Sequence, residues 1–232
     1  MRRRWLAMTT MVLATACEGP SEGLDDGGAP VEGACEDAEA GAGEDPWADC
    51  VDAFEPAEEV SFGHDAMPEI VLGPPVGGGE LMGGTDVASL GCGGSITLGF
   101  VEPWPVDGPG PDLVVFENAF RSGEITFVEP AEILVSADGE DWRAFPCEPD
   151  GGPEAPVGCA GLHPVLTTEP GAPIDPATLG GDVFDLADVG LAEARWIRIV
   201  DRTAEHYGSD TWCLGAAGGF DLDAVAALEA AP

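Results

Sequence analysis

Residues Asp112 to Asn118 read DLVVFEN, and this stretch decides the fold of the chain. A Gly-Pro-Gly-Pro run at 108–111 precedes its central apolar residues, which are mostly β-branched or aromatic. A short apolar run bounded by turn residues is typical of a strand buried on both faces, in a sheet covered by a second layer. Acidic and amide side chains lie at both of its ends. A carboxylate in such a place is costly to bury unless a cation meets it.

Further short apolar segments repeat this pattern along the chain. The extended segments that we predict are 95–100 (SITLGF), 132–136 (EILVS), 183–187 (VFDLA), 195–201 (RWIRIVD) and 218–228 (GGFDLDAVAAL). The Asp-Gly pair at 138–139 predicts a hairpin whose second arm is 141–145. Short strands separated by Gly and Pro turns predict an all-β sandwich or barrel, in one domain at 48–232.

The N-terminus has the pattern of an export signal. Arg residues at 2–4 precede a short apolar segment that ends LATAC, with Cys17 last. This segment is too short to span a membrane as a mature helix. Its end resembles the lipobox of bacterial lipoproteins, in which the cysteine is lipidated and becomes the first mature residue; ordinary cleavage at the same bond is the alternative. We expect a signal peptide at 1–16, lipidation of Cys17 and an acidic flexible tether at 17–47.

The chain carries a large excess of negative charge. It has 44 acidic residues against 8 basic ones, and its formal net charge is −36. Such a surface repels nucleic acid and anionic lipid, so we expect no nucleic-acid partner and contact with a membrane only through the lipid anchor. Divalent cations are the natural counterions of a chain of this kind.

The cysteine count also indicates an exported protein. Setting Cys17 aside for the lipid leaves six of the seven cysteines, an even set that suits disulfides in an oxidising compartment. Six cysteines allow about 15 pairings. The pairing that we predict is Cys35–Cys50, Cys92–Cys213 and Cys147–Cys159. The expected location is therefore outside the cytoplasm, as a membrane-anchored lipoprotein of the outer membrane or cell surface.

Acids near strand ends form the predicted metal site. In FDLDAV, Asp221 and Asp223 are two residues apart, so a strand places both on one face and Phe220, Leu222 and Ala224 on the other. Calcium binds six to eight oxygen atoms from carboxylates, amides, backbone carbonyls and water. The predicted ligands of a structural Ca²⁺ are Asp112, Glu117, Asn118, Asp185, Asp221 and Asp223. The alternative is a solvated acidic face.

No catalytic constellation emerges from the sequence, so we expect no enzyme. Paired carboxylates can hydrolyse glycosidic bonds, but in a chain this acidic some pair meets the spacing by chance. His64, His163 and His206 lie far apart in sequence, and neither HExxH nor GxSxG occurs, so they are interpreted as loop histidines. The Gly-rich loop at 73–84 lacks the Lys of a phosphate-binding loop.

Three aromatic residues, Trp104, Tyr207 and Trp212, lie in predicted loops. Aromatic rings on loops at one end of a sandwich can stack on sugar rings. The alternative is that these rings cap the core or pack against a disulfide, since Trp212 is next to Cys213.

The chain resembles a known group of modules. VSADGEDW at 135–142 and ARWIRIVD at 194–201 are similar to segments of discoidin and related galactose-binding-like modules. Five blocks also occur in the order found in a group of bacterial and archaeal exported cell-surface proteins. These blocks are GGSITLGF, GPGPDLVVFEN, VSADG, FDLAD and GGFDLDAV, which begin at residues 93, 108, 135, 184 and 218. The resemblance implies a jelly-roll β-sandwich with a structural calcium near the final strand, and it brings no catalytic residue.

Together, these observations predict a lipid-anchored, exported, non-catalytic β-sandwich. Calcium and disulfides would stabilise it, and its loops would bind a glycan or a cell-surface protein. The alternatives are a structural component of the cell envelope without a specific ligand, and a carbohydrate-active hydrolase that uses paired carboxylates.

Overall fold

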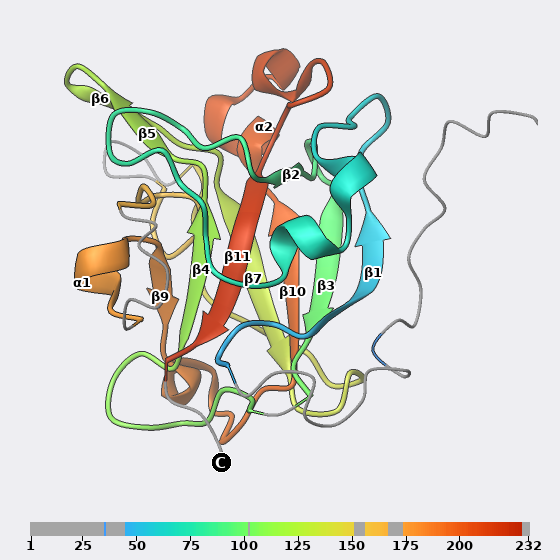
Figure 1. Cartoon of the computed structure of the whole chain (residues 1–232), viewed down its shortest axis with the longest axis vertical. Helices are drawn as coiled ribbons and strands as arrows, with labels where there is room; N and C mark the ends of the chain where they lie inside the picture. Colours follow the sequence, from blue (N-terminus) through green and yellow to red (C-terminus); the bar gives the residue numbers. More distant parts are fainter. Residues whose placement is uncertain (1–34, 36–44, 102, 151–155, 167–173, 229–232) are drawn as a thin grey trace, which may run out of the picture.

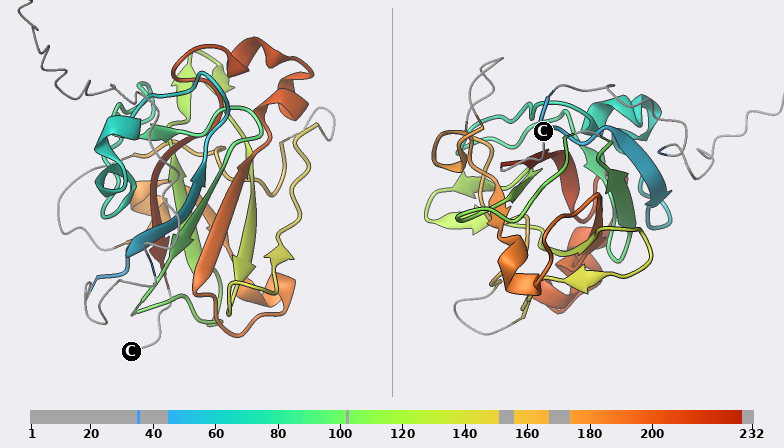
Figure 2. Two further views of the ribbon diagram at one scale, coloured as in Figure 1. Left: turned by 90° about the vertical axis from the view of Figure 1, so that its right-hand side faces the viewer. Right: turned by 90° about the horizontal axis from the view of Figure 1, so that it is seen from below.

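The computed structural model describes Cys35 and residues 45–101, 103–150, 156–166 and 174–228. The predicted signal peptide, Cys17 and most of the predicted tether lie outside these residues. Two antiparallel sheets pack face to face in the described part of the chain, as Figure 1 and the turned views of Figure 2 show. The expected all-β fold is confirmed.

The first sheet has five strands and the second has four. In spatial order the first comprises β1 (Cys50–Glu55), β3 (Ser95–Gly99), β10 (Trp196–Asp201), β7 (Ala131–Ser136) and β8 (Arg143–Ala144). The second comprises β2 (Ala88–Ser89), β11 (Asp221–Ala227), β4 (Leu113–Glu117) and β9 (Asp182–Phe184). A separate hairpin, β5 (Phe120–Ser122) and β6 (Ile125–Phe127), projects from one end of the sandwich (Figure 1). We call this the hairpin end.

Strand β4 is buried on both faces, as its sequence predicts. Leu113 and Val115 belong to the core between the sheets. Val114 and Phe116 pack on the opposite face, with Val165 among their neighbours. Full burial of a side chain of this size contributes about 1.5–3 kcal/mol, so this strand alone anchors much of the second sheet.

Strand β11 contains a β-bulge that the sequence does not predict. Leu222 is paired with Glu117 and Ala224 with Phe116, so Asp223 is an extra residue opposite β4. The bulge turns Ala224 to the outer face of the sheet, against Phe116. The expectation that Ala224 shares the face of Leu222 is therefore wrong.

Short helical turns occupy the connections. They are η1 (His64–Ala66), η2 (Glu69–Val71), α1 (Pro176–Leu179), η3 (Leu186–Val189), α2 (Thr203–Tyr207) and η4 (Asp210–Cys213). The extended segment predicted at 183–187 ends early, because the Asp185 side chain accepts a hydrogen bond from the Ala187 amide and caps η3. Among the described residues there is no helix with the length and apolar character needed to cross a membrane.

The three predicted disulfides are confirmed, and together they indicate an oxidising, exported environment. Cys35–Cys50 ties the N-terminal segment to the first residue of β1. Cys92–Cys213 joins the turn before β3 to η4, across 121 residues of sequence. Cys147–Cys159 closes a short loop after β8.

Candidate functional site

The predicted calcium ligands fall into separate groups. Asp112 and Asp185 lie at one end of β4, whereas Glu117, Asn118 and Asp221 lie near the other end, which is the hairpin end. Five strand residues at about 3.3 Å each separate Asp112 from Glu117 by about 16 Å, too far for one ion. The structure therefore divides the predicted site into two acidic clusters.

The cluster away from the hairpin end contains Asp107, Asp112 and Asp185. One carboxylate oxygen from each lies within 4.8 Å of the others, which is close enough for a metal ion. Both oxygens of the buried Asp112 already accept backbone hydrogen bonds, from Gly108 N at 2.8 Å and Leu186 N at 2.8 Å. Burial raises the pKa of Asp112, and these two bonds oppose that rise. Asp112 thus has a structural role in holding two loops together.

The cluster at the hairpin end contains polar atoms without partners. The side chain of Glu117 is buried, and its Oε2 atom has no hydrogen-bond partner in the described part of the chain. The Oδ1 atom of Asn118 is buried and unpartnered in the same way. The Asn118 amide donates to Asp221 Oδ2 at 3.3 Å, and the Ser89 hydroxyl donates to Asp221 Oδ1. Unsatisfied buried oxygens of this kind are rare and require an explanation.

Glu129, which is not among the predicted ligands, belongs to this cluster. Burial raises its pKa to about 9, and the charges of Asp221 and Asp201 add to the rise. Burial, followed by the charge of Glu129, raises the pKa of Glu117 well above its usual range. Burial also raises the pKa of Asp221 to about 6. The only sequence signal for Glu129 is an acid placed between Val128 and Pro130, just before a buried strand.

Among the described residues no cation compensates these acids. The arginine ion pairs involve other carboxylates: Arg121–Glu80, Arg195–Glu193, Arg202–Glu132 and Arg202–Glu205. We call Glu117, Asn118, Glu129 and Asp221 the acidic centre. Its oxygen donors are of the kinds that calcium binds, although the three carboxylates do not offer oxygens that all lie within 4.8 Å of one another, as those of Asp107, Asp112 and Asp185 do.

A Gly-rich loop covers part of the acidic centre. Gly77, Gly78 and Gly84 line a small cavity together with Glu117 and Asn118. A Cβ atom on Gly83 would lie only 2.5 Å from Asn118 Oδ1, so this approach requires glycine. The backbone of the loop thus packs directly against the Asn118 side chain of the acidic centre.

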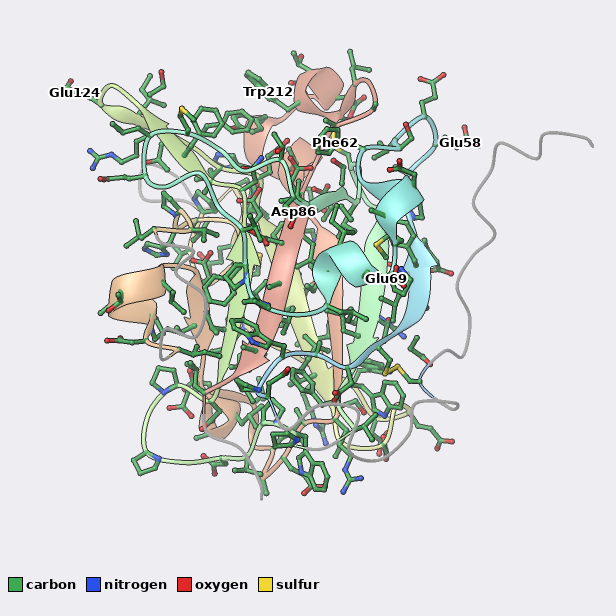
Figure 3. All side chains as sticks on the ribbon, in the orientation of Figure 1. Glu58, Phe62, Glu69, Asp86, Glu124 and Trp212 are labelled. Atoms are coloured by element: carbon green, nitrogen blue, oxygen red, sulfur yellow. A yellow bond between two sulfur atoms is a disulfide. The ribbon has the colours of Figure 1, made fainter. Side chains whose placement is uncertain are left out.

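Asp223 binds a backbone amide of the Gly-rich loop. Its two oxygens accept hydrogen bonds from Val76 N at 2.9 Å and 3.1 Å, which fixes the start of the Gly-rich loop. Burial raises the pKa of Asp223 to about 7, and the charge of Asp86, labelled in Figure 3, contributes.

Two of the three predicted stacking residues, Tyr207 and Trp212, lie together, and Trp104 does not. Tyr207 and Trp212 lie at the hairpin end, where Trp212 is labelled in Figure 3. Both pack against Phe127, and Tyr207 donates a hydrogen bond to Val128 O at 2.9 Å. Trp104 lies elsewhere, with the Arg195 guanidinium 3.7 Å from its ring centre. Trp212 keeps 45% of its surface exposed, so it alone of this aromatic cluster offers a sizeable surface to a ligand.

Two of the three histidines bond to backbone carbonyl groups, and the third bonds to a carboxylate. His64 Nε2 bonds with Ser89 O at 2.8 Å and His206 Nδ1 with Pro149 O at 2.8 Å, as expected of loop histidines. His163 instead has an acidic partner, Asp182, at 2.6 Å. No sequence pattern marks this pair, because its two members are 19 residues apart.

No family model, curated protein or solved structure matches this chain. Its class is therefore defined by its own structure, as an all-β protein of two antiparallel sheets with three disulfides and a buried acidic centre.

Proposed function

We propose that the protein is an exported, non-catalytic β-sandwich module, stabilised by calcium, that binds a glycan or a cell-surface partner through its loops. A jelly-roll, galactose-binding-like arrangement of the two sheets and a lipid on Cys17 are part of this proposal. The observation that carries the calcium site is the buried, unpartnered Oε2 atom of Glu117.

Calcium accounts for the composition of the acidic centre. Burying several carboxylates together is costly unless a cation neutralises them. Glu117, Glu129 and Asp221 supply carboxylate oxygens, Asn118 supplies an amide oxygen, and the Gly-rich loop and water supply the remaining ligands that calcium needs. Asp112 and Asp185 lie at the other end of β4, and both oxygens of Asp223 accept the Val76 amide, so these three predicted ligands are left out of the proposed site.

The binding role is supported by charge and exposure. The strongly negative chain disfavours nucleic acid and anionic lipid, whereas an uncharged glycan or a cationic protein surface meets no such repulsion.

The lipobox-like LATAC segment supports the lipid anchor. Replacement of Cys17 by Ala should move the protein from the membrane fraction to the soluble fraction of a bacterial host, while its folding is unaffected.

The calcium site is tested by thermal unfolding of the mature protein at pH 7, in millimolar calcium and in excess chelator. Calcium at 100 times its dissociation constant stabilises the folded state by about 2.7 kcal/mol. For a domain of this size we therefore expect a rise in Tm of about 5–11 °C. An unchanged midpoint would contradict the proposal.

Two isosteric variants locate the ion. Glu117→Gln should abolish most of the calcium response, because it removes a charged ligand from the acidic centre. Asp107→Asn is the matched control in the other acidic cluster and should leave the response intact. A response lost in the control but kept in Glu117→Gln would place the ion at Asp107, Asp112 and Asp185 instead.

A further inference from the structure

A cleft of about 650 Å³ opens on the flank of the sandwich, between the edge strands β8 and β9 of the two sheets. The flank formed by β9 and α1 is at the left of Figure 1. Phe145, just after β8, packs against Phe184 in β9 in the lining of the cleft, with ring centroids 5.0 Å apart. Glu148 and residues 157–159, next to the Cys147–Cys159 disulfide, line one wall. The volume is within the range of sites for small ligands, about 300–1,000 Å³.

His163 and Asp182 form a fixed pair in this cleft. Asp182 is buried, its Oδ1 atom lies 2.6 Å from His163 Nδ1, and its Oδ2 atom accepts the Leu162 amide at 2.8 Å. The side chain of His163 is 69% exposed. Because Nδ1 faces Asp182, the other ring nitrogen, Nε2, faces away from it and is available to a ligand.

The polar groups of the cleft suit hydroxyl groups. A neutral His163 ring that donates from Nδ1 to Asp182 accepts at Nε2, and a protonated ring donates there; a hydroxyl can serve as partner in either case. The carboxylates of Glu148 and Asp188 also line the cleft and accept hydrogen bonds from hydroxyl groups. Those two acids and the net charge disfavour an anionic ligand.

The rest of the lining is mostly apolar. Leu162, Val157 and Val183 face the same space as the polar groups. A sugar ring combines hydroxyl groups on its rim with apolar C–H faces, and this combination matches the cleft. We propose that the flank cleft binds an uncharged sugar ring of a glycan, with His163 Nε2, Glu148 and Asp188 as its hydrogen-bonding groups. This inference rests on the glycan-binding role proposed above and gives it a location.

The competing location is Trp212 at the hairpin end. Both surfaces are tested with the mature protein in calcium, first against an array of neutral, anionic and amino glycans and then by titration calorimetry with a neutral sugar that binds. His163→Ala removes an exposed side chain and should weaken binding about three- to tenfold, the effect of one neutral hydrogen bond. Trp212→Ala should change affinity less than His163→Ala does.

A second readout does not depend on the variants. Addition of the sugar should shift the imidazole NMR signals of His163 and leave those of His206, the internal reference, unchanged. A stacking site at Trp212 would not move the His163 signals.

Three outcomes would overturn the inference. Binding that is lost in Trp212→Ala and kept in His163→Ala would place the glycan at the hairpin end, which leaves the proposed function standing. Binding confined to anionic or amino glycans would reject the uncharged ligand. Absence of binding to every neutral sugar at millimolar concentration would reject the cleft as a sugar site, while the calcium melt would still decide the stabilising ion independently.

Discussion

Replacement of Glu129 by Gln should stabilise the protein in chelator and weaken its response to calcium. Glutamine has the size of glutamate and keeps an oxygen that can accept the hydrogen bond from the Gly219 amide. The substitution therefore changes the charge of the acidic centre more than its packing.

The magnitude follows from the protonation of Glu129. Burial raises its pKa from 4.5 to about 9, so without a cation the folded protein holds a proton that the unfolded chain has lost at pH 7. Taking up this proton costs about 1.4 kcal/mol for each pH unit above the unfolded pKa, or about 3 kcal/mol at pH 7. Glu129→Gln removes that cost, which corresponds to a rise in Tm of about 6–12 °C in chelator.

The sign of the pH dependence is also fixed. Between pH 4.5 and about 9 the folded state binds more protons than the unfolded state, so the stability of the calcium-free protein falls as the pH rises. Glu129→Gln should lack this contribution to the pH dependence of the free energy of unfolding. In calcium the stability advantage of Glu129→Gln should largely disappear, because the native carboxylate is a ligand and the amide is a weaker one.

The assay is urea unfolding of both proteins at pH 5 and pH 7, each in chelator and in calcium. Glu124→Gln, on the exposed turn between β5 and β6 and labelled in Figure 3, is the matched control and should have no effect. A variant that is less stable than the native protein in chelator, with an unchanged pH slope, would refute the reasoning.

Three other changes test the fold and the cleft. Replacing Cys92 and Cys213 together by Ala frees a loop of 121 residues and should cost about 5 kcal/mol of stability; an unchanged urea midpoint would contradict this. Ile197→Ala leaves a cavity in the core and should cost about 2–5 kcal/mol, read from circular-dichroism melts. Asp182→Asn should lower the pKa of His163 in an NMR titration, because the hydrogen bond that His163 donates to the Asp182 carboxylate raises it. The stability that this pair supplies is present below the unfolded histidine pKa of about 6.5 and lost as the pH rises through the folded value.

The central strands could be predicted because their signals are local. In β3 apolar and polar residues alternate, in β10 Ile197 and Ile199 are two residues apart on the buried face, and turn residues bound β4 and β7. β1 escapes prediction because an irregularity between Val51 and Ala53 breaks its pairing with β3, and with it the alternation in sequence. The bulge at Asp223 could not be predicted either, because nothing in FDLDAV marks the extra residue.

The sequence predicts acids near strand ends but only part of their grouping in space. Acids at strand ends suggested a cation, and Glu117, Asn118 and Asp221 do come together. Assigning Asp112 to the same group failed because the two ends of one strand cannot reach one ion. Glu129 and the His163–Asp182 pair depend on which loops meet in three dimensions, and a single sequence carries little information on such contacts.

The Cys35–Cys50 bond determines how the domain responds to mechanical force. Tension applied from the N-terminal side crosses the sulfur–sulfur link directly to Cys50 and therefore bypasses the bridge between Trp47 and Ala226. The load arrives at the first residue of β1, an edge strand bonded to β3. Pulling would thus peel β1 away pair by pair, beginning at Cys50 and Gly99, and this ladder is where a tethered molecule would yield first.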